Sequence, residues 1–324
     1  MSSDLLPLPP GGRAPDDVWW IDPEAGIRLR AALWEAPDAE GHVIFLTGRT
    51  EYLEKVAIPA EQFVQRGYSV ISLDWRGQGL ASRQVEPSLK GHVEDFAEFQ
   101  TDLDAMLASD QAKSLSGRRL LVGHSMGGCI STHAIARPQI ADTLDGAILC
   151  APMLGINLPP VMRFFAWGTV KIAMLLGKRD CWPPFGDVKT PYVLSEPEDN
   201  VLTSDKQVMD WMIHVAQEHP ESSLAMPTLK WFQAATTAMQ RATGFPAPNL
   251  PVMCLLGSSE QVVDSKAVRA GAKRMHAELA EFKNAQHELF IESQTIRDQV
   301  WDKIDGFLDQ HGLPNLQRQT PPSA

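Results

Sequence analysis

The stretch LLVGHSMGGCI, residues 120–130, places Ser125 between two glycines directly after an apolar run. A Gly-x-Ser-x-Gly pattern at the end of a buried strand is typical of a nucleophile elbow, a sharp turn between strand and helix that presents the serine hydroxyl above a sheet. Gly123 and Gly127 suit such a turn because strand and helix approach closely there. The alternative is an unreactive bend, so the rest of the chain must supply partners for the serine.

Short apolar runs recur on both sides of this turn and suit strands buried on both faces of a parallel sheet. They are residues 42–47, 68–74, 118–123, 146–151 and 251–257. Residues 27–34 alternate apolar and polar side chains, which favours a half-exposed strand. Apolar residues with helical spacing lie at 93–107 and 296–307. This alternation predicts an α/β fold with a mainly parallel central sheet flanked by helices, whose ligands bind at the carboxyl ends of the strands.

The pattern breaks between residues 152 and 248, where helix-like segments follow one another without a buried strand. This block holds seven of the twelve methionines and four of the nine tryptophans, so we expect a helical cap inserted over the carboxyl edge of the sheet. The predicted organisation is a flexible arm at 1–18, a core at 19–151 and 249–312, the cap at 152–248, and a flexible tail at 313–324.

Composition excludes several classes of function. With 29 basic and 40 acidic residues the formal charge is −11, which argues against nucleic acid as a partner. The four cysteines are scattered and predict buried free thiols, and no histidine spacing indicates a metal site. The first residues lack the pattern of a secretory signal, which favours a cytoplasmic location. The apolar stretch 161–177 is interrupted by Arg163 and Lys171, and it predicts a core or lid helix or a helix on a membrane surface.

A serine hydroxyl is a weak nucleophile that needs a base, and the base needs an orienting carboxylate. On this kind of scaffold the chain order is serine, acid, histidine. His276, His287 and His311 lie late enough in the chain, and the first and last of these stand in helix ends. His287 follows a strand-like segment and precedes the last helix, so we predict that it is the base.

The acid is expected after the strand-like run 251–257. Glu260 lies at the carboxyl end of that strand and is the predicted acid, whereas Asp264 is the alternative and suits an N-cap of the next helix. Two backbone N–H groups are needed for the oxyanion. We assign them to Met126, next to the nucleophile, and to Arg49 in the loop after residues 42–47.

The sequence resembles the α/β-hydrolases of the group formed by serine aminopeptidases S33, monoacylglycerol lipases and bacterial lysophospholipases. The matching segments are LTGRTEYLEK, DWRGQGLASR, GHVEDFAEFQTDLDAML, GHSMGG, NVLTSDKQ, GSSEQVVD and AQHELF. The GRTEYLEK element resembles the lysophospholipase L2 branch. Thr47 stands where many relatives carry histidine, and Glu260 stands where the family usually has aspartate. The resemblance implies that Asp74 and Arg76 are loop-fixing residues and that His124 is a packed neighbour of the nucleophile.

The resemblance implies a serine hydrolase that cleaves carboxylic esters of fatty acyl lipids, such as lysophospholipids or monoacylglycerols, with no metal or organic cofactor. Peripheral membrane contact through the cap would follow, and the oligomeric state is left open. A peptidase or a small-ester esterase of the same fold is an alternative, and an acidic cluster such as SEPEDN, residues 195–200, would favour the peptidase. A non-catalytic ligand-binding protein of this fold is a further alternative.

Overall fold

A computed structural model describes residues 5–158, 160–184, 190–195 and 200–319. Its centre is a single eight-stranded sheet in the order β1-β2-β4-β3-β5-β6-β7-β8, in which all pairs except β1 with β2 and β2 with β4 are parallel. The strands are β1 (Asp17–Glu24), β2 (Ile27–Trp34), β3 (Gly41–Leu46), β4 (Tyr68–Leu73), β5 (Arg118–His124), β6 (Gly146–Cys150), β7 (Val252–Gly257) and β8 (Glu278–Phe282). The predicted mainly parallel α/β fold is confirmed.

The expectation of a half-exposed strand at residues 27–34 is wrong. From Leu29 onward every residue of β2 is buried, because β2 lies between β1 and β4 inside the sheet. Its one buried charge, Arg30, is neutralised by ion pairs with Glu54 and Asp74 at 2.9 and 2.8 Å. The alternation of apolar and polar residues therefore predicted exposure wrongly, because the polar residue Arg30 is a buried cation that is paired with carboxylates.

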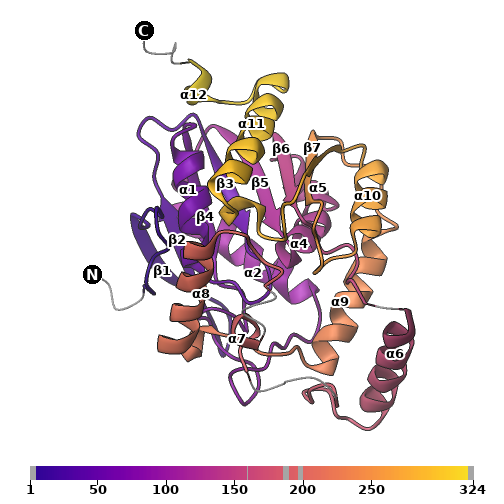
Figure 1. Cartoon of the computed structure of the whole chain (residues 1–324). Helices are drawn as coiled ribbons and strands as arrows, with labels where there is room; N and C mark the ends of the chain where they lie inside the picture. Colours follow the sequence, from indigo (N-terminus) through magenta and orange to yellow (C-terminus); the bar gives the residue numbers. More distant parts are fainter. Residues whose placement is uncertain (1–4, 159, 185–189, 196–199, 320–324) are drawn as a thin grey trace.

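Helices cover both faces of the sheet (Figure 1). One core cluster packs the sheet against α2 and α4, and a second packs the other face against α1 and α11. The helices of these layers and their neighbours are α1 (Ala57–Val64), α2 (Ala97–Leu107), α3 (Asp110–Ser114), α4 (Met126–Ile135), α5 (Pro138–Ala141), α10 (Ser265–Arg274), α11 (Gln294–Gln310) and α12 (Leu316–Gln319). Short 3-10 turns are η1 (Leu53–Val56), η2 (Pro220–Ser222) and η3 (Leu289–Ile291).

In the described part of the chain between β6 and β7 there are four helices, and they gather on one side of the sheet in Figure 1. They are α6 (Pro160–Leu175), α7 (Tyr192–Ser195), α8 (Lys206–Glu218) and α9 (Leu229–Ala242). Backbone hydrogen bonds join this stretch to loops that follow parallel strands, from Ala225 to Leu89 and from Glu288 to Leu202. The helical stretch therefore lies over the carboxyl edge. In the described part of the chain, no helix is long and apolar enough to cross a membrane.

Residues 1–4 of the predicted N-terminal arm and residues 320–324 of the predicted C-terminal tail lie outside the described residues. From residue 5 the N-terminal segment contacts the core, because Leu6 is buried and its N–H donates to Glu54 at 2.8 Å. At the other end, Leu313 is buried and the N–H of Leu316 donates to the carbonyl of Arg66 at 3.3 Å. The four cysteines are free thiols, of which Cys181 is partly exposed and not buried as expected.

Candidate active site

Ser125 occupies the turn between β5 and α4 with backbone angles φ 50° and ψ −114°. A positive φ is costly for a residue with a side chain and persists only where neighbours hold it. The Ser125 N–H donates to the carbonyl of Cys150 at 2.9 Å, and its carbonyl accepts from the N–H of Met153 at 2.8 Å. A Cβ on Gly127 would lie 2.0 Å from the carbonyl oxygen of Leu46, so the close approach of helix and strand requires glycine. This geometry is that of a nucleophile elbow.

His287 and Glu260 lie together at the same edge of the sheet, in the loops that follow β8 and β7. The Nδ1–H of His287 donates to Glu260 Oε2 at 2.7 Å, and both residues are buried. The other carboxylate oxygen accepts the backbone N–H groups of Val262 and Val263 at 2.6 and 3.0 Å. Burial by itself raises the pKa of Glu260, but the charge of His287 and these hydrogen bonds outweigh it and lower that pKa. Glu260 is thus a fixed, ionised partner for one nitrogen of His287.

Asp264, the alternative acid, is the N-cap of α10. Its carboxylate accepts the backbone N–H groups of Lys266 and Ala267 at 2.9 and 3.3 Å. These bonds satisfy helix donors that have no partner inside the helix. The structure brings Glu260, and not Asp264, into contact with His287.

The loop after β3 approaches the elbow from the neighbouring strand. A Cβ built on Gly48 would lie 3.1 Å from the Ser125 Cβ, which places the backbone of Arg49 beside the serine. Two hydrogen bonds fix this loop, since the Gly48 N–H donates to Glu51 and the N–H of Thr50 donates to Gln78 at 2.6 Å. Met126, the other predicted oxyanion donor, is the first residue of α4 and is buried. The two predicted donors therefore adjoin Ser125 from different segments, one from the start of α4 and one from the loop after β3.

Asp74 and Arg76, just after β4, fix the segments that follow β3 and β4. The Asp74 carboxylate accepts the N–H groups of Leu53 and Leu80 at 2.8 and 2.9 Å. Arg76 pairs with Asp102 at 2.6 Å. These contacts agree with the loop-fixing role that the resemblance implies.

Behind the elbow lies a buried cluster of four charged groups, Glu51, Lys55, His124 and Glu288. His124 Nδ1–H donates to Glu51 at 2.7 Å, and its Nε2 lies 3.2 Å from the carbonyl oxygen of His287. Lys55 contacts Glu288 at 2.5 Å and Glu51 at 3.3 Å. Both ring nitrogens of His124 thus face acceptors, as an imidazolium requires.

The charges in this cluster set the protonation of its members. Burial alone lowers the pKa of His124, but Glu51 and Glu288 outweigh it and raise that pKa to about 9. Burial raises the pKa of Glu51, but Lys55 and His124 hold it far below its usual range. Ligand atoms of Glu51, His124 and Glu288 lie within 4.8 Å of one another, close enough to hold a metal ion. Two protein cations already balance the two carboxylates, so the cluster suits ion pairing better than a metal.

Sequence reasoning did not find this cluster. Lys55 and Glu51 share one loop, but Glu288 is 233 residues from Lys55 in the chain, so no local spacing links them. The usable signal was His124 itself, since a buried histidine inside an elbow needs polar partners. The cluster ties the loop after β3 to the backbone of His287 through the ring of His124.

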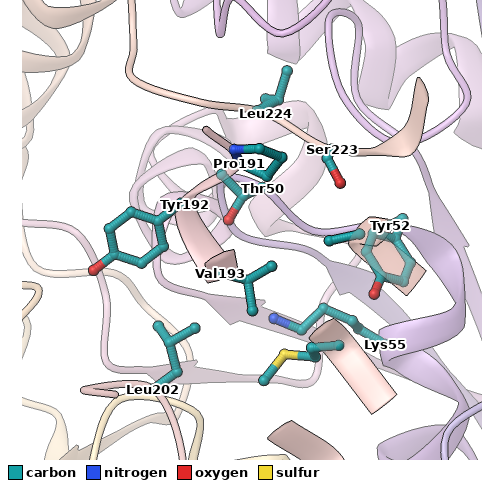
Figure 2. Close-up of a pocket in the computed structure, with 11 residues that line it drawn as sticks. Thr50, Tyr52, Lys55, Pro191, Tyr192, Val193, Leu202, Ser223 and Leu224 are labelled. Atoms are coloured by element: carbon teal, nitrogen blue, oxygen red, sulfur yellow. The ribbon is translucent and has the colours of Figure 1, made fainter. Parts of the chain in front are cut away.

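Two cavities lie beside loops that neighbour the elbow, and neither lining includes Ser125, Glu260 or His287. The first, shown in Figure 2, lies between the loop after β3 and helices α7 and α8. It is lined by Thr50, Tyr52, Lys55, Pro191, Tyr192, Val193, Leu202, Met212, Ala216, Ser223 and Leu224. The second, of about 220 Å³, lies between the loop after β6 and α9, and its lining includes Leu154, Ile156, Phe232 and Met239. The second adjoins Ser125 through Met153, the residue before Leu154.

The fold and this site define an α/β-hydrolase, and comparison with known proteins places it further. The family model described as serine aminopeptidase, S33 matches residues 37–294, so the chain belongs to that family. A probable lysophospholipase L2 of Haemophilus influenzae is 28% identical over 269 residues, covering 82% of this chain and 83% of that protein. Lysophospholipase L2 of Escherichia coli K12 is 26% identical over 318 residues, covering 91% and 88%.

Solved structures agree on the fold. A soluble variant of monoglyceride lipase from Saccharomyces cerevisiae, in complex with a substrate analogue, superposes with a TM-score of 0.68 at 20% identity, covering 92% of this chain and 97% of that one. A thermostable carboxyl esterase from Bacillus coagulans gives 0.67 at 17% identity, covering 91% and 98%. Together with the family match, the relatives identify this chain as an ester hydrolase.

Proposed function

We propose that this protein cleaves fatty acyl monoesters of glycerol or glycerophosphate through Ser125, His287 and Glu260. Ser125 Oγ attacks the ester carbonyl while His287 Nε2 takes its proton, and the alkoxide of the substrate leaves with that proton as an alcohol. The resulting acyl-enzyme is opened by water, which His287 deprotonates in turn. The N–H groups of Met126 and Arg49 stabilise the oxyanion in both steps. Glu260 keeps the Nδ1–H tautomer of His287 and stabilises the imidazolium.

The observation that carries this proposal is the buried 2.7 Å contact between His287 Nδ1 and Glu260, in loops at the carboxyl edge of the sheet where Ser125 also lies with φ 50°. An imidazole oriented by a carboxylate at the edge that holds a strained serine turn is the arrangement that acyl transfer needs. The lipid part of the proposal is supported by relatives named as lysophospholipases over more than four fifths of the chain.

The helical stretch 152–248 would act as the cap that selects the substrate. Its α9 forms one wall of the 220 Å³ cavity, and most of that lining is aliphatic or aromatic. Such a surface binds an acyl chain by removing apolar area from water. We assign the acyl chain to this cavity because the loop after β6 both lines it and bonds the Ser125 carbonyl.

Helix α6 would bring the cap to a lipid surface. Ile172, Leu175 and Leu176 are 60%, 87% and 65% exposed near its end, and Lys171 and Lys178 are exposed beside them. Exposed aliphatic side chains next to cations suit an interface with anionic lipids. This arrangement supports the proposed peripheral membrane contact through the cap.

The deciding experiment measures fatty acid release from palmitoyl lysophosphatidylcholine, with p-nitrophenyl butyrate as a control substrate. We expect the wild type to cleave both esters and Ser125→Ala to cleave neither. Cleavage of the butyrate ester alone would leave a small-ester esterase, and cleavage of an aminoacyl amide instead would favour the peptidase. Of the acidic segment 195–200 that would favour the peptidase, residues 196–199 lie outside the described residues. Failure of Ser125 to react with a fluorophosphonate would indicate a non-catalytic ligand-binding protein.

A further inference from the structure

Arg49 differs from the other arginines of the interior. Arg30, Arg66 and Arg76 are each buried and each pair with carboxylates at 3.0 Å or less. Arg49 has no carboxylate partner among the residues that the structure describes. Its guanidinium donates through Nη2 to the carbonyl of Ala225 and lies 5.3 Å from the centre of the Trp231 ring. A partly desolvated cation without a counter-ion is costly, which calls for an anion that none of the described residues supplies.

The hydrogen-bonding capacity of Arg49 is also unfilled. Its Nε is buried without a partner, and Nη1 makes no hydrogen bond to any described residue. Arg83 provides the contrast, because its three nitrogens donate to four backbone carbonyls although it too lacks a carboxylate. Burial lowers the pKa of Arg49, to about 10, so the side chain still carries its charge at neutral pH. All three nitrogens of Arg83 are thus hydrogen-bonded within the protein, whereas Nε and Nη1 of Arg49 have no partner among the described residues.

Arg49 follows the residue that packs against Ser125, and its guanidinium lies one side-chain length from that contact. Its backbone follows Gly48, which faces Ser125, and its guanidinium lies roughly 6 Å further along the side chain. The guanidinium lies against Gly91, where a Cβ would come within 2.7 Å of Nη2, and the side chain as a whole remains partly exposed. Tyr192, which lines the cavity of Figure 2, acts on the Arg49 charge electrostatically. The phosphorus of a lysophospholipid lies about six bonds from its ester carbonyl, a comparable reach.

We propose that the Arg49 guanidinium binds the phosphate of a lysophospholipid head group and makes the enzyme prefer lysophospholipids to monoacylglycerols. This inference rests on the proposed function and names the substrate class within it. The guanidinium can donate charge-assisted hydrogen bonds to phosphate oxygens through Nη1, which makes no hydrogen bond to a described residue, and a neutral glycerol offers no anionic acceptor in that place. Arg49 would then serve twice, with its backbone N–H at the oxyanion and its side chain at the head group.

The test compares kcat/KM for palmitoyl lysophosphatidylcholine and for monopalmitoylglycerol, which share the acyl chain. In Arg49→Gln we expect the ratio of the two values to fall about ten- to hundred-fold, the range of a lost hydrogen bond to a charged group. Arg49→Lys should recover part of the preference. Arg83→Gln is the matched control, because Arg83 also donates to a carbonyl of the cap, that of Glu221. In this variant the ratio of the two kcat/KM values should stay within threefold of wild type. Equal losses on both substrates in Arg49→Gln would mean that Arg49 only holds the cap, which overturns the proposal.

A binding measurement separates this proposal from the hydrolysis itself. Ser125→Ala is titrated calorimetrically with 1-O-octylglycerol 3-phosphate, with 1-O-octylglycerol and with glycerol 3-phosphate. We expect the phosphorylated ether to bind at least tenfold more tightly than the other two, and the advantage to vanish in Ser125→Ala/Arg49→Gln. Equal binding of the two ethers overturns the proposal even where the wild type releases fatty acid. If the wild type cleaves neither lipid, the proposed function fails, and the titration still decides whether Arg49 binds phosphate. Tight binding of glycerol 3-phosphate alone would indicate a site for a soluble phosphate ester and overturn the lipid assignment.

Discussion

Replacing Glu260 by glutamine should remove most of the catalytic power while leaving the fold intact. One oxygen of Glu260 accepts two backbone N–H groups and the other accepts His287 Nδ1–H. In Glu260→Gln, the single amide oxygen can accept either the two backbone N–H groups or the Nδ1–H of His287, but not both. If it keeps the backbone bonds, the amide N–H₂ faces Nδ1, so the proton of His287 must move to Nε2. That tautomer cannot accept the proton of Ser125.

The expected loss follows from that tautomer change. In a serine protease triad the corresponding acid-to-amide change lowers kcat by about 10⁴. We expect a loss of about 10³ to 10⁴ here, or roughly 4 to 5 kcal/mol of transition-state stabilisation. Glu260→Asp should recover part of the rate, because the carboxylate returns with a shorter reach.

The matched control is Asp264→Asn, the same acid-to-amide change four residues away. Asparagine caps helices about as well as aspartate, so α10 should keep its N-cap and kcat should stay within about twofold. Steady-state hydrolysis of p-nitrophenyl butyrate, with circular dichroism to check folding, measures both variants. A thousandfold loss in Asp264→Asn, or more than a tenth of wild-type kcat in Glu260→Gln, would refute the assignment of the acid.

Three further changes test the site and the cap. The pKa of His124 in the folded protein, about 9, lies above the 6.5 of free histidine. Its charge therefore contributes on the order of 3 kcal/mol to the free energy of unfolding. This contribution is fully present below pH 6.5 and is lost as pH rises through 9. In urea unfolding, the stability gap between wild type and His124→Gln should therefore narrow from pH 6 to pH 10, and a constant gap would contradict a charged His124. Gly127→Ala should cost about 1 to 3 kcal/mol by thermal unfolding, since its Cβ would lie 2.0 Å from the Leu46 carbonyl oxygen, and an unchanged Tm would contradict the required close approach. Leu175→Glu should reduce cosedimentation with anionic vesicles roughly tenfold without changing Tm, because Leu175 is 87% exposed; equal vesicle binding would exclude α6 as the contact.

Local patterns were sufficient for the fold class and for the serine turn. Buried apolar runs followed by helical periodicity specify a parallel sheet whatever the details of packing, and β3, β4, β5, β6 and β7 all appear where such runs occur. The turn at Ser125 is equally local, since the small residues around it are required by the approach of a strand to the helix that directly follows it.

Local patterns failed where a residue's environment is made by distant segments. The alternation of β2 predicted exposure, but the strand lies inside the sheet and Arg30 is neutralised by Glu54 and Asp74. The charged cluster behind the elbow joins Lys55 to Glu288, which only the closure of the whole sheet brings together. Spacing along a chain carries no information about such contacts.

The sequence by itself therefore determined which chemical groups are available and in what order they occur along the strands, because these depend on neighbours in the chain. The tertiary structure alone decided their pairing. Glu260 meets His287 while Asp264 caps a helix, and the buried Nε of Arg49 has no partner among the described residues. Pairing and desolvation depend on distances and burial in three dimensions, and these set both the charge of each group and the ligand that it can still bind.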